Sequence, residues 1–147
     1  MPAEGKISAV SLDYKDHRMN SDRYQRGLAK ITEMEGEIGK KVIETIKEIS
    51  PDFAQYLVEF VFGDIYSRSE LSLKIKELIT LASMATMGSA PLQVKVHINS
   101  ALNVGCSEKE IIETFLQIIP SAGMVLSMNA LLIAKEVFDE RKVNAKK

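Results

Sequence analysis

The chain has 147 residues, which suits one domain with a buried core and leaves little room for two. Its 19 basic and 20 acidic residues balance, which argues against a general nucleic-acid-binding protein, because such proteins bind phosphates through clustered Lys and Arg. The single cysteine, Cys106, excludes an intrachain disulfide, and the first residues lack the basic start and apolar run of a signal peptide. We therefore expect a cytoplasmic protein.

The first part of the chain predicts helices separated by clear breaks. Residues 1–20 are polar without a sustained period, so we expect a loose arm there. A helix is predicted over 21–34, with a break near Gly36, and a second over 38–49. The second helix carries apolar residues at spacings of four, four and three, which predict a stripe facing the core. These residues are Ile38, Val42, Ile46 and Ile49.

The sequence Ser50-Pro51-Asp52 is typical of a helix start. Serine can cap the first amides, proline suits the first turn, and an acidic residue is favoured near the positive end of a helix. We expect this helix to end around Gly63 and residues 63–68 to form a connection.

The second part predicts further helices with marked ends. One helix is expected over 73–87, closed by Gly88, and another from Pro91 to about residue 104, ended by Gly105.

A capping box, in which Ser107 and Glu110 satisfy each other's backbone amides, predicts a helix that runs to about residue 119. The last helix is expected over 121–142, separated by Pro120 and followed by a basic tail over 143–147. No alternating run of strand length occurs, so we predict an all-α bundle of about six to seven helices.

Charge is distributed unevenly along the chain. Residues 1–77 hold 26 charged side chains, residues 78–134 hold five, and the runs 78–94 and 115–134 hold none. Polar residues and a proline interrupt the second run, which argues against a membrane span. Helices with so little polar surface must be buried on most sides, and a chain this small cannot easily bury two of them. We therefore infer a homo-oligomer.

One further segment, from Ala90 to His97, completes an ordered set of residues that spans several predicted helices. Side chains three, four and seven residues apart share a helix face, so Ala90, Gln93 and His97 lie on one stripe. The other members of the set are the run Gly63-Asp64-Ile65-Tyr66-Ser67-Arg68, then Leu71, Lys74, Glu77, Leu78, Ala101, Leu102 and Gly105. Over roughly residues 23–141 the chain resembles the carboxymuconolactone decarboxylase and alkylhydroperoxidase D superfamily.

The resemblance implies one helical domain over 21–142, alkylhydroperoxidase D-like, which assembles from dimers into larger rings, commonly trimers or hexamers. It also reveals two departures. The peroxidase branch has two cysteines where this chain has Ala90 and Gln93, so a dithiol cycle cannot run here. The decarboxylase branch has an acidic residue near the second position, and Gln93 cannot titrate in its place.

His97 is the main candidate for a catalytic residue, because an imidazole can transfer protons at neutral pH. The alternative is a buried structural histidine. Glu77 stands where the resemblance implies a relay glutamate, and burial near His97 would let it hold or pass a proton. The alternative is an exposed carboxylate paired with Lys74 or Lys76.

The resemblance also implies that Tyr66 and Arg68 bind substrate. An arginine can hold a carboxylate through two parallel hydrogen bonds. The alternatives are loop packing for Tyr66 and a salt bridge from Arg68 to Asp64 or Glu70.

Three more residues have side chains of the kinds that functional sites use. Gln93 could orient His97 or donate to an enolate oxygen, or it could be an interfacial amide. Cys106 lies just before Ser107, where a helix N-terminus could lower the pKa of its thiol, although isolated cysteines are more often inert. His17 has no Cys, Asp or Glu at ligand spacing, and no nucleotide-binding motif occurs, so we expect neither a metal nor another cofactor.

The leading hypothesis is a carboxy-lyase of aromatic-compound catabolism that decarboxylates a small carboxylate or lactone by cofactor-free acid–base chemistry. Two alternatives stay open. One is an alkylhydroperoxidase-like antioxidant protein that uses Cys106 with an external reductant. The other is a non-catalytic oligomer that binds a small carboxylate or lactone. We expect neither nucleic acid nor a membrane as partner.

Overall fold

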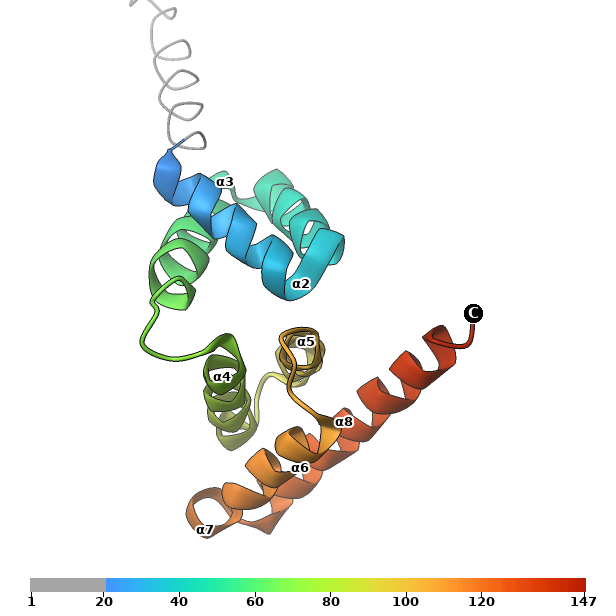
Figure 1. Ribbon diagram of the computed structural model, residues 1–147. Coiled ribbons are helices and arrows are strands. Elements are labelled where there is room, and N and C mark those ends of the chain that lie inside the picture. Colours follow the sequence, from blue (N-terminus) through green and yellow to red (C-terminus); the bar gives the residue numbers. More distant parts are fainter. Residues whose placement is uncertain (1–20) are drawn as a thin grey trace, which may run out of the picture. The chain divides into compact units, whose positions relative to one another are not determined.

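The computed structural model describes residues 21–147, which fold into helices with no strand among them, so the predicted all-α fold is confirmed (Figure 1). The arm predicted over 1–20 lies outside the described residues. Internal contacts gather the chain into two compact units, which divide between Arg68 and Ser69. The domain predicted over 21–142 therefore comprises two units, each with its own buried residues.

The first unit begins with α2 (Asp22–Ile49), whose first amides are capped by the hydroxyl of Ser21. The predicted break at Gly36 is confirmed, because this residue has φ 64° and ψ −149° within the helix. Glycine adopts a positive φ without steric cost, so the chain can turn back on itself here (Figure 1).

The start predicted at Ser50 is confirmed, since its side chain caps α3 (Pro51–Tyr56). The helix then continues as a π-helix, η1 (Leu57–Tyr66), so the connection predicted from residue 63 is wrong. Gly63 serves close packing instead of a helix end, because a Cβ at this position would lie 2.8 Å from the carbonyl oxygen of Arg23.

Helix α2 and η1 are held together by close backbone packing and by ion pairs. A Cβ on Gly27 would lie 2.0 Å from the carbonyl oxygen of Val58, so only glycine fits there. Beside this contact, the guanidinium of Arg23 donates to both carboxylate oxygens of Asp64. Arg26 donates to the carbonyl of Gly63 at 2.8 Å.

The prediction that an apolar stripe in the second half of α2 faces the core is wrong for three of its four residues. Ile38, Val42 and Ile49 are exposed, whereas Gly39 and Ile43 are the buried residues of this half. Periodicity identifies an apolar helix face, but it does not show whether the surface that covers this face belongs to the same unit.

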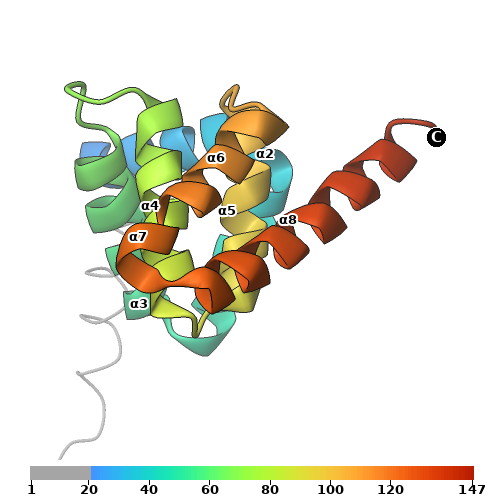
Figure 2. The ribbon, with the colours of Figure 1, turned by 90° about the horizontal axis from the view of Figure 1, so that it is seen from below.

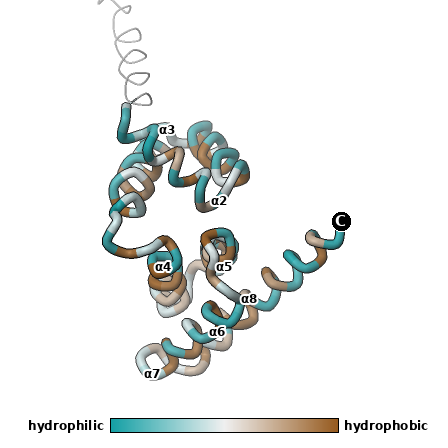
Figure 3. The backbone as a smooth tube through the Cα atoms, viewed as in Figure 1, coloured by the Kyte–Doolittle hydropathy of each residue, from teal (hydrophilic) through white to brown (hydrophobic). Residues whose placement is uncertain are grey.

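The second unit is a bundle of five helices within the described residues, in which α8 crosses α4 and α5 (Figure 2). They are α4 (Leu73–Met87), α5 (Pro91–Asn103), α6 (Glu108–Gln117), α7 (Ile119–Ala122) and α8 (Met124–Asn144). Their core is built from aliphatic residues and two phenylalanines, including Leu81, Ile98, Ile111, Phe115 and Phe138. Figure 3 shows many hydrophobic residues along α4, in line with the uncharged run that begins at residue 78.

The ends of these helices follow the predicted signals, with one exception. Gly88 closes α4 in the left-handed conformation, and the capping box of Ser107 and Glu110 opens α6. The break expected at Pro120 is present, because α6 ends at Gln117 and this proline lies in the first turn of the next helix, α7, where its missing amide proton costs nothing. The exception is a second break, at Gly123 with φ 91°, which separates α7 from α8 and was not predicted. No helix in residues 21–147 is both long and apolar enough to cross a membrane.

The ion pair between η1 and α2 predicts a loss of stability in acid. The hydrogen bond from Arg23 lowers the pKa of Asp64 below its ordinary value. Asp64 therefore stabilises the folded state above that ordinary value, and the contribution disappears as the pH falls through the lowered pKa. We expect the unfolding free energy of the wild type to decline more steeply below about pH 4 than that of Asp64→Asn. Parallel urea titrations at several acidic pH values measure this difference, and equal slopes would contradict it.

Candidate functional site

The candidate site is built on the helical hairpin of α4 and α5. Gly88 ends α4, and Pro91 begins α5 two residues after Ser89, so the two helices run back along each other. This arrangement places Glu77, in the first half of α4, beside His97, in the middle of α5.

Glu77, which is buried, and His97, which is half-buried, form a hydrogen-bonded pair. The Nδ1 atom of His97 lies 2.9 Å from Oε2 of Glu77. The side chain of Glu77 is 0% exposed, and that of His97 is 12% exposed. Lys74 pairs with Glu110 at 3.0 Å instead. The alternative that the sequence left open, an exposed Glu77 carboxylate paired with a lysine, is therefore excluded by the burial of Glu77.

The pair sets the chemistry of the imidazole. If the carboxylate of Glu77 is ionised it can only accept, so an Nδ1–H of His97 would donate to it and Nε2 would be left to exchange protons with a ligand. When Nε2 takes up a proton, the buried carboxylate faces the imidazolium and balances its charge. A carboxylate that orients a histidine in this way is a common feature of acid–base catalysts.

Two buried polar atoms lie near this pair without hydrogen-bond partners among the described residues. They are Oε1 of Glu77 and the hydroxyl oxygen of Ser100, one helical turn after His97 on α5. Buried polar atoms are seldom left unpaired, so each unpaired one calls for an explanation, and a catalytic role is one such explanation. The sequence did not indicate Ser100, because a serine within a helix usually faces solvent or bonds its own backbone.

Gln93 lies one turn before His97 on the same helix, but it is exposed. No hydrogen bond joins it to His97 or to another side chain in residues 21–147, so Glu77 and not Gln93 orients the imidazole in this structure. Ala90, at the other position where the peroxidase branch has a thiol, lines an apolar cavity of about 310 Å³. Neither position offers a titratable group.

Cys106 lies in the core of the second unit and not at an open helix terminus. Burial raises the pKa of its thiol above the ordinary value, which corrects the expectation that the following helix lowers it. Its sulfur lies 3.7 Å from the carbonyl oxygen of Lys74. A protonated, buried thiol without a second cysteine is poorly suited to attack a peroxide.

Tyr66 and Arg68 belong to the end of the first unit. Tyr66 is buried and stacks on Phe62, with 5.4 Å between the ring centroids, and Arg68 is exposed just beyond η1. Asp64 already binds Arg23 and Arg26. The substrate-binding roles that the resemblance implies for Tyr66 and Arg68 stay predictions.

No group of three or more His, Cys, Asp or Glu side chains in the described part of the chain is arranged to hold a metal ion. His17 lies outside that part. Among residues 21–147, Glu77 and His97 are therefore the titratable groups that the fold brings together at a buried position on the hairpin.

Comparison with known proteins identifies the family of the chain. The model of the carboxymuconolactone decarboxylase family matches residues 51–136, more than half of the chain, and the matched region contains both helices of the hairpin. The chain belongs to the carboxymuconolactone decarboxylase family.

Two relatives match the chain over two thirds or more of its length. A 4-carboxymuconolactone decarboxylase of Acinetobacter baylyi is 29% identical over 124 residues, which cover 83% of this chain and 92% of that relative. A protein of 15.0 kDa from Paracoccus denitrificans, described as uncharacterized, is 27% identical over 99 residues, which cover 67% of this chain and 74% of that relative.

The burial of Cys106 predicts slow chemical modification of its thiol. Alkylation needs an accessible thiolate, and the raised pKa keeps the buried thiol protonated at neutral pH. We expect iodoacetamide to label the native protein at least about tenfold more slowly than the urea-unfolded protein. Intact-mass spectrometry follows the reaction, and equal rates in the two states would show that the thiol is accessible in the native fold.

Proposed function

We propose that the protein is a decarboxylase-type acid–base catalyst in which His97 transfers the proton and Glu77 positions it. The observation that supports this proposal is the buried hydrogen bond between Nδ1 of His97 and the carboxylate of Glu77. Membership of the carboxymuconolactone decarboxylase family and similarity to a 4-carboxymuconolactone decarboxylase point to the same class of reaction.

The proposed substrate is a small lactone or carboxylate whose decarboxylation leaves an enolate, with γ-carboxymuconolactone as the first compound to test. The bond between the carboxylate carbon and the substrate breaks, its electron pair stays on the substrate as a dienolate, and carbon dioxide leaves. The imidazolium of His97 then gives its Nε2 proton to carbon and becomes the neutral Nδ1–H tautomer, which Glu77 holds. Solvent returns the proton to Nε2 for the next turnover.

The remaining roles are part of the same proposal. Gln93 is exposed on the hairpin, so its amide is free to donate a hydrogen bond to a developing enolate oxygen, as the sequence suggested. Arg68 would hold a substrate carboxylate and Tyr66 would donate to the enolate, as the resemblance implies. The place of the reaction in aromatic-compound catabolism and the cytoplasmic location stay predictions.

The alternative of a one-cysteine peroxidase has less support. Such a reaction requires a thiolate that peroxide can reach, whereas Cys106 is buried and the pKa of its thiol is raised. Ala90 and Gln93 leave no second thiol to resolve an oxidised cysteine.

The proposal predicts that turnover depends on both members of the pair. His97→Ala removes the proton donor, and Glu77→Gln keeps the side-chain volume but removes the charge that faces the imidazolium. We expect each variant to lower kcat about a hundredfold or more, because general acid–base catalysis contributes about this much. Loss of ultraviolet absorbance of γ-carboxymuconolactone measures turnover.

The matched control is Glu140→Gln, which makes the same chemical change at an exposed position near the end of α8. It should keep wild-type activity, and circular dichroism should show that all variants fold. Wild-type turnover by folded His97→Ala would refute the proposal. An inactive but folded wild type that binds the lactone would favour the non-catalytic ligand-binding alternative.

A further inference from the structure

Two buried oxygen atoms of the α4–α5 hairpin have no hydrogen-bond partner within residues 21–147. They are Oε1 of Glu77 and Oγ of Ser100. The side chain of Glu77 is 0% exposed, and Ser100 is 1% exposed. Within residues 69–147, no other buried side-chain oxygen or nitrogen is left without a hydrogen bond. The proposed function uses Oε2 of Glu77, which His97 contacts, and leaves these two atoms unexplained.

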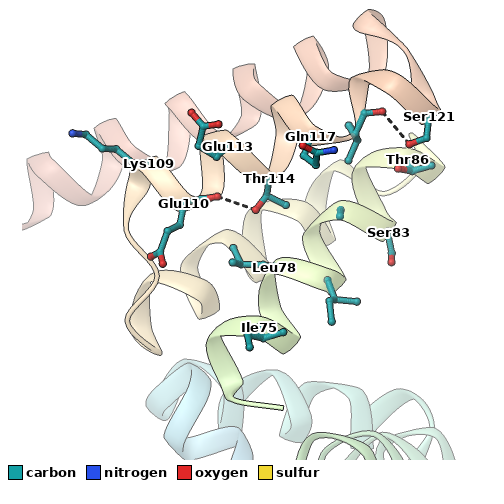
Figure 4. A pocket seen from close by; sticks show the side chains of 13 residues that line it. Ile75, Leu78, Ser83, Thr86, Lys109, Glu110, Glu113, Thr114, Gln117 and Ser121 are labelled. Carbon is teal, nitrogen blue, oxygen red and sulfur yellow. Dashed lines mark hydrogen bonds between the residues drawn. The ribbon is translucent and has the colours of Figure 1, made fainter. Parts of the chain in front are cut away.

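The hydroxyl of Ser100 differs from other hydroxyls of the second unit. A hydroxyl within a helix can donate to the carbonyl oxygen one turn earlier. Figure 4 shows this arrangement on α6, where Thr114 donates to the carbonyl oxygen of Glu110 at 2.8 Å. Ser127, the other buried serine of this unit, donates to the carbonyl oxygen of Phe115 at 2.7 Å. Ser100 forms no such bond, so its hydroxyl can donate to another acceptor.

The hairpin places Ser100 level with Glu77. Helices α4 and α5 run back along each other from the turn between Gly88 and Ala90, so residues at equal distances from this turn lie side by side. Glu77 is eleven residues before Gly88, and Ser100 is ten residues after Ala90. Ser100 also shares a helix face with His97, three residues earlier, and His97 contacts Glu77. The two unpaired oxygens therefore face the same interface between the helices.

Three other polar groups near Glu77 are already engaged. The amine of Lys74, one turn earlier on α4, is paired with a glutamate of α6 at 3.0 Å. The thiol of Cys106 lies 3.7 Å from the carbonyl oxygen of Lys74 and donates in that direction. The imidazole of His97 contacts Oε2 of Glu77. Ser100 is therefore the neighbouring donor that can satisfy Oε1.

We propose that Ser100 is a positioning residue, whose hydroxyl donates to Oε1 of Glu77 while His97 contacts Oε2. The bond forms by rotation of the serine side chain among its staggered positions. Both oxygens of the carboxylate then have a partner, and the carboxylate is fixed in the orientation in which it faces His97.

The chemical effect of this bond is on the ionisation of Glu77. Burial disfavours an ionised carboxylate, whereas hydrogen bonds donated to the carboxylate favour the ionised form. A second donor therefore helps to keep Glu77 ionised, and an ionised Glu77 holds the Nδ1–H form of His97. The inference rests on the Glu77–His97 pair of the proposed function, but its first test needs no substrate.

The first test follows the side-chain carboxyl carbon of Glu77 by nuclear magnetic resonance in the full chain, with Glu77→Gln used to assign the signal. At a mildly acidic pH where both forms are populated, the signal gives the ratio of protonated to ionised Glu77. We expect Ser100→Ala to raise this ratio about tenfold, because the ionised form loses one hydrogen bond. Circular dichroism establishes that the variant folds.

The matched control is Ser127→Ala, which also removes one buried serine hydroxyl from the second unit. That hydroxyl donates to the backbone and not to Glu77, so the ratio should stay at its wild-type value. An unchanged ratio in folded Ser100→Ala would overturn the proposal. An equal rise in Ser127→Ala would also overturn it, because the effect would then not be specific to Ser100.

The second test measures turnover of γ-carboxymuconolactone by the same variants. Ser100 is buried and acts through Glu77, so we expect Ser100→Ala to lower kcat about tenfold and to leave KM near its wild-type value. Ser127→Ala should keep both constants. A change confined to KM would contradict the positioning role. A wild type without lactone turnover would count against the proposed function alone, because the ratio in the first test is measured without substrate.

Discussion

The chemistry available to this protein depends on one interaction, the hydrogen bond between the buried carboxylate of Glu77 and Nδ1 of His97. A carboxylate with no exposed surface is unfavourable unless a partner compensates for its lost hydration, so its position within α4 requires the imidazole beside it. The same contact fixes which nitrogen of His97 faces a ligand. The α4–α5 hairpin, in which Gly88 ends α4 and Pro91 begins α5, holds the two residues together.

Two opposite faces of α4 differ in their exposure to solvent. Glu77 and Leu81 lie on buried faces, whereas Ile75 and Ile79 line an exposed groove beside α6. A helix with so few charges past residue 77 has little surface that is suited to water.

Much of the fold could be predicted from the sequence, because many helix ends are specified locally. Ser50, Gly88 and the capping box at Ser107 act through their own neighbours, and each occurs as predicted. The errors arose where tertiary packing decides. Gly63 lies within a π-helix at a point where α2 approaches it closely, and the apolar spacing from Ile38 to Ile49 does not show which surface covers that helix face.

The sequence identified the main residues of the candidate site but not how they are arranged. The resemblance drew attention to His97 and Glu77, but the sequence could not establish their contact or the burial of Glu77, since both depend on how two helices pack. Ser100 gave no signal in the sequence, and the choice between Gln93 and Glu77 as the residue that orients the imidazole could not be made there, because the pattern of a single helix does not show which neighbour lies beside the imidazole.

The most direct test of the central interaction is the tautomer of His97, measured by long-range proton–nitrogen correlation spectra at mildly alkaline pH, with His97→Gln used to assign the signals. The expected result is a neutral imidazole with its proton on Nδ1, and a loss of this preference in Glu77→Gln. A proton on Nε2, or the mixture of tautomers found for a free imidazole, would contradict the role assigned to Glu77.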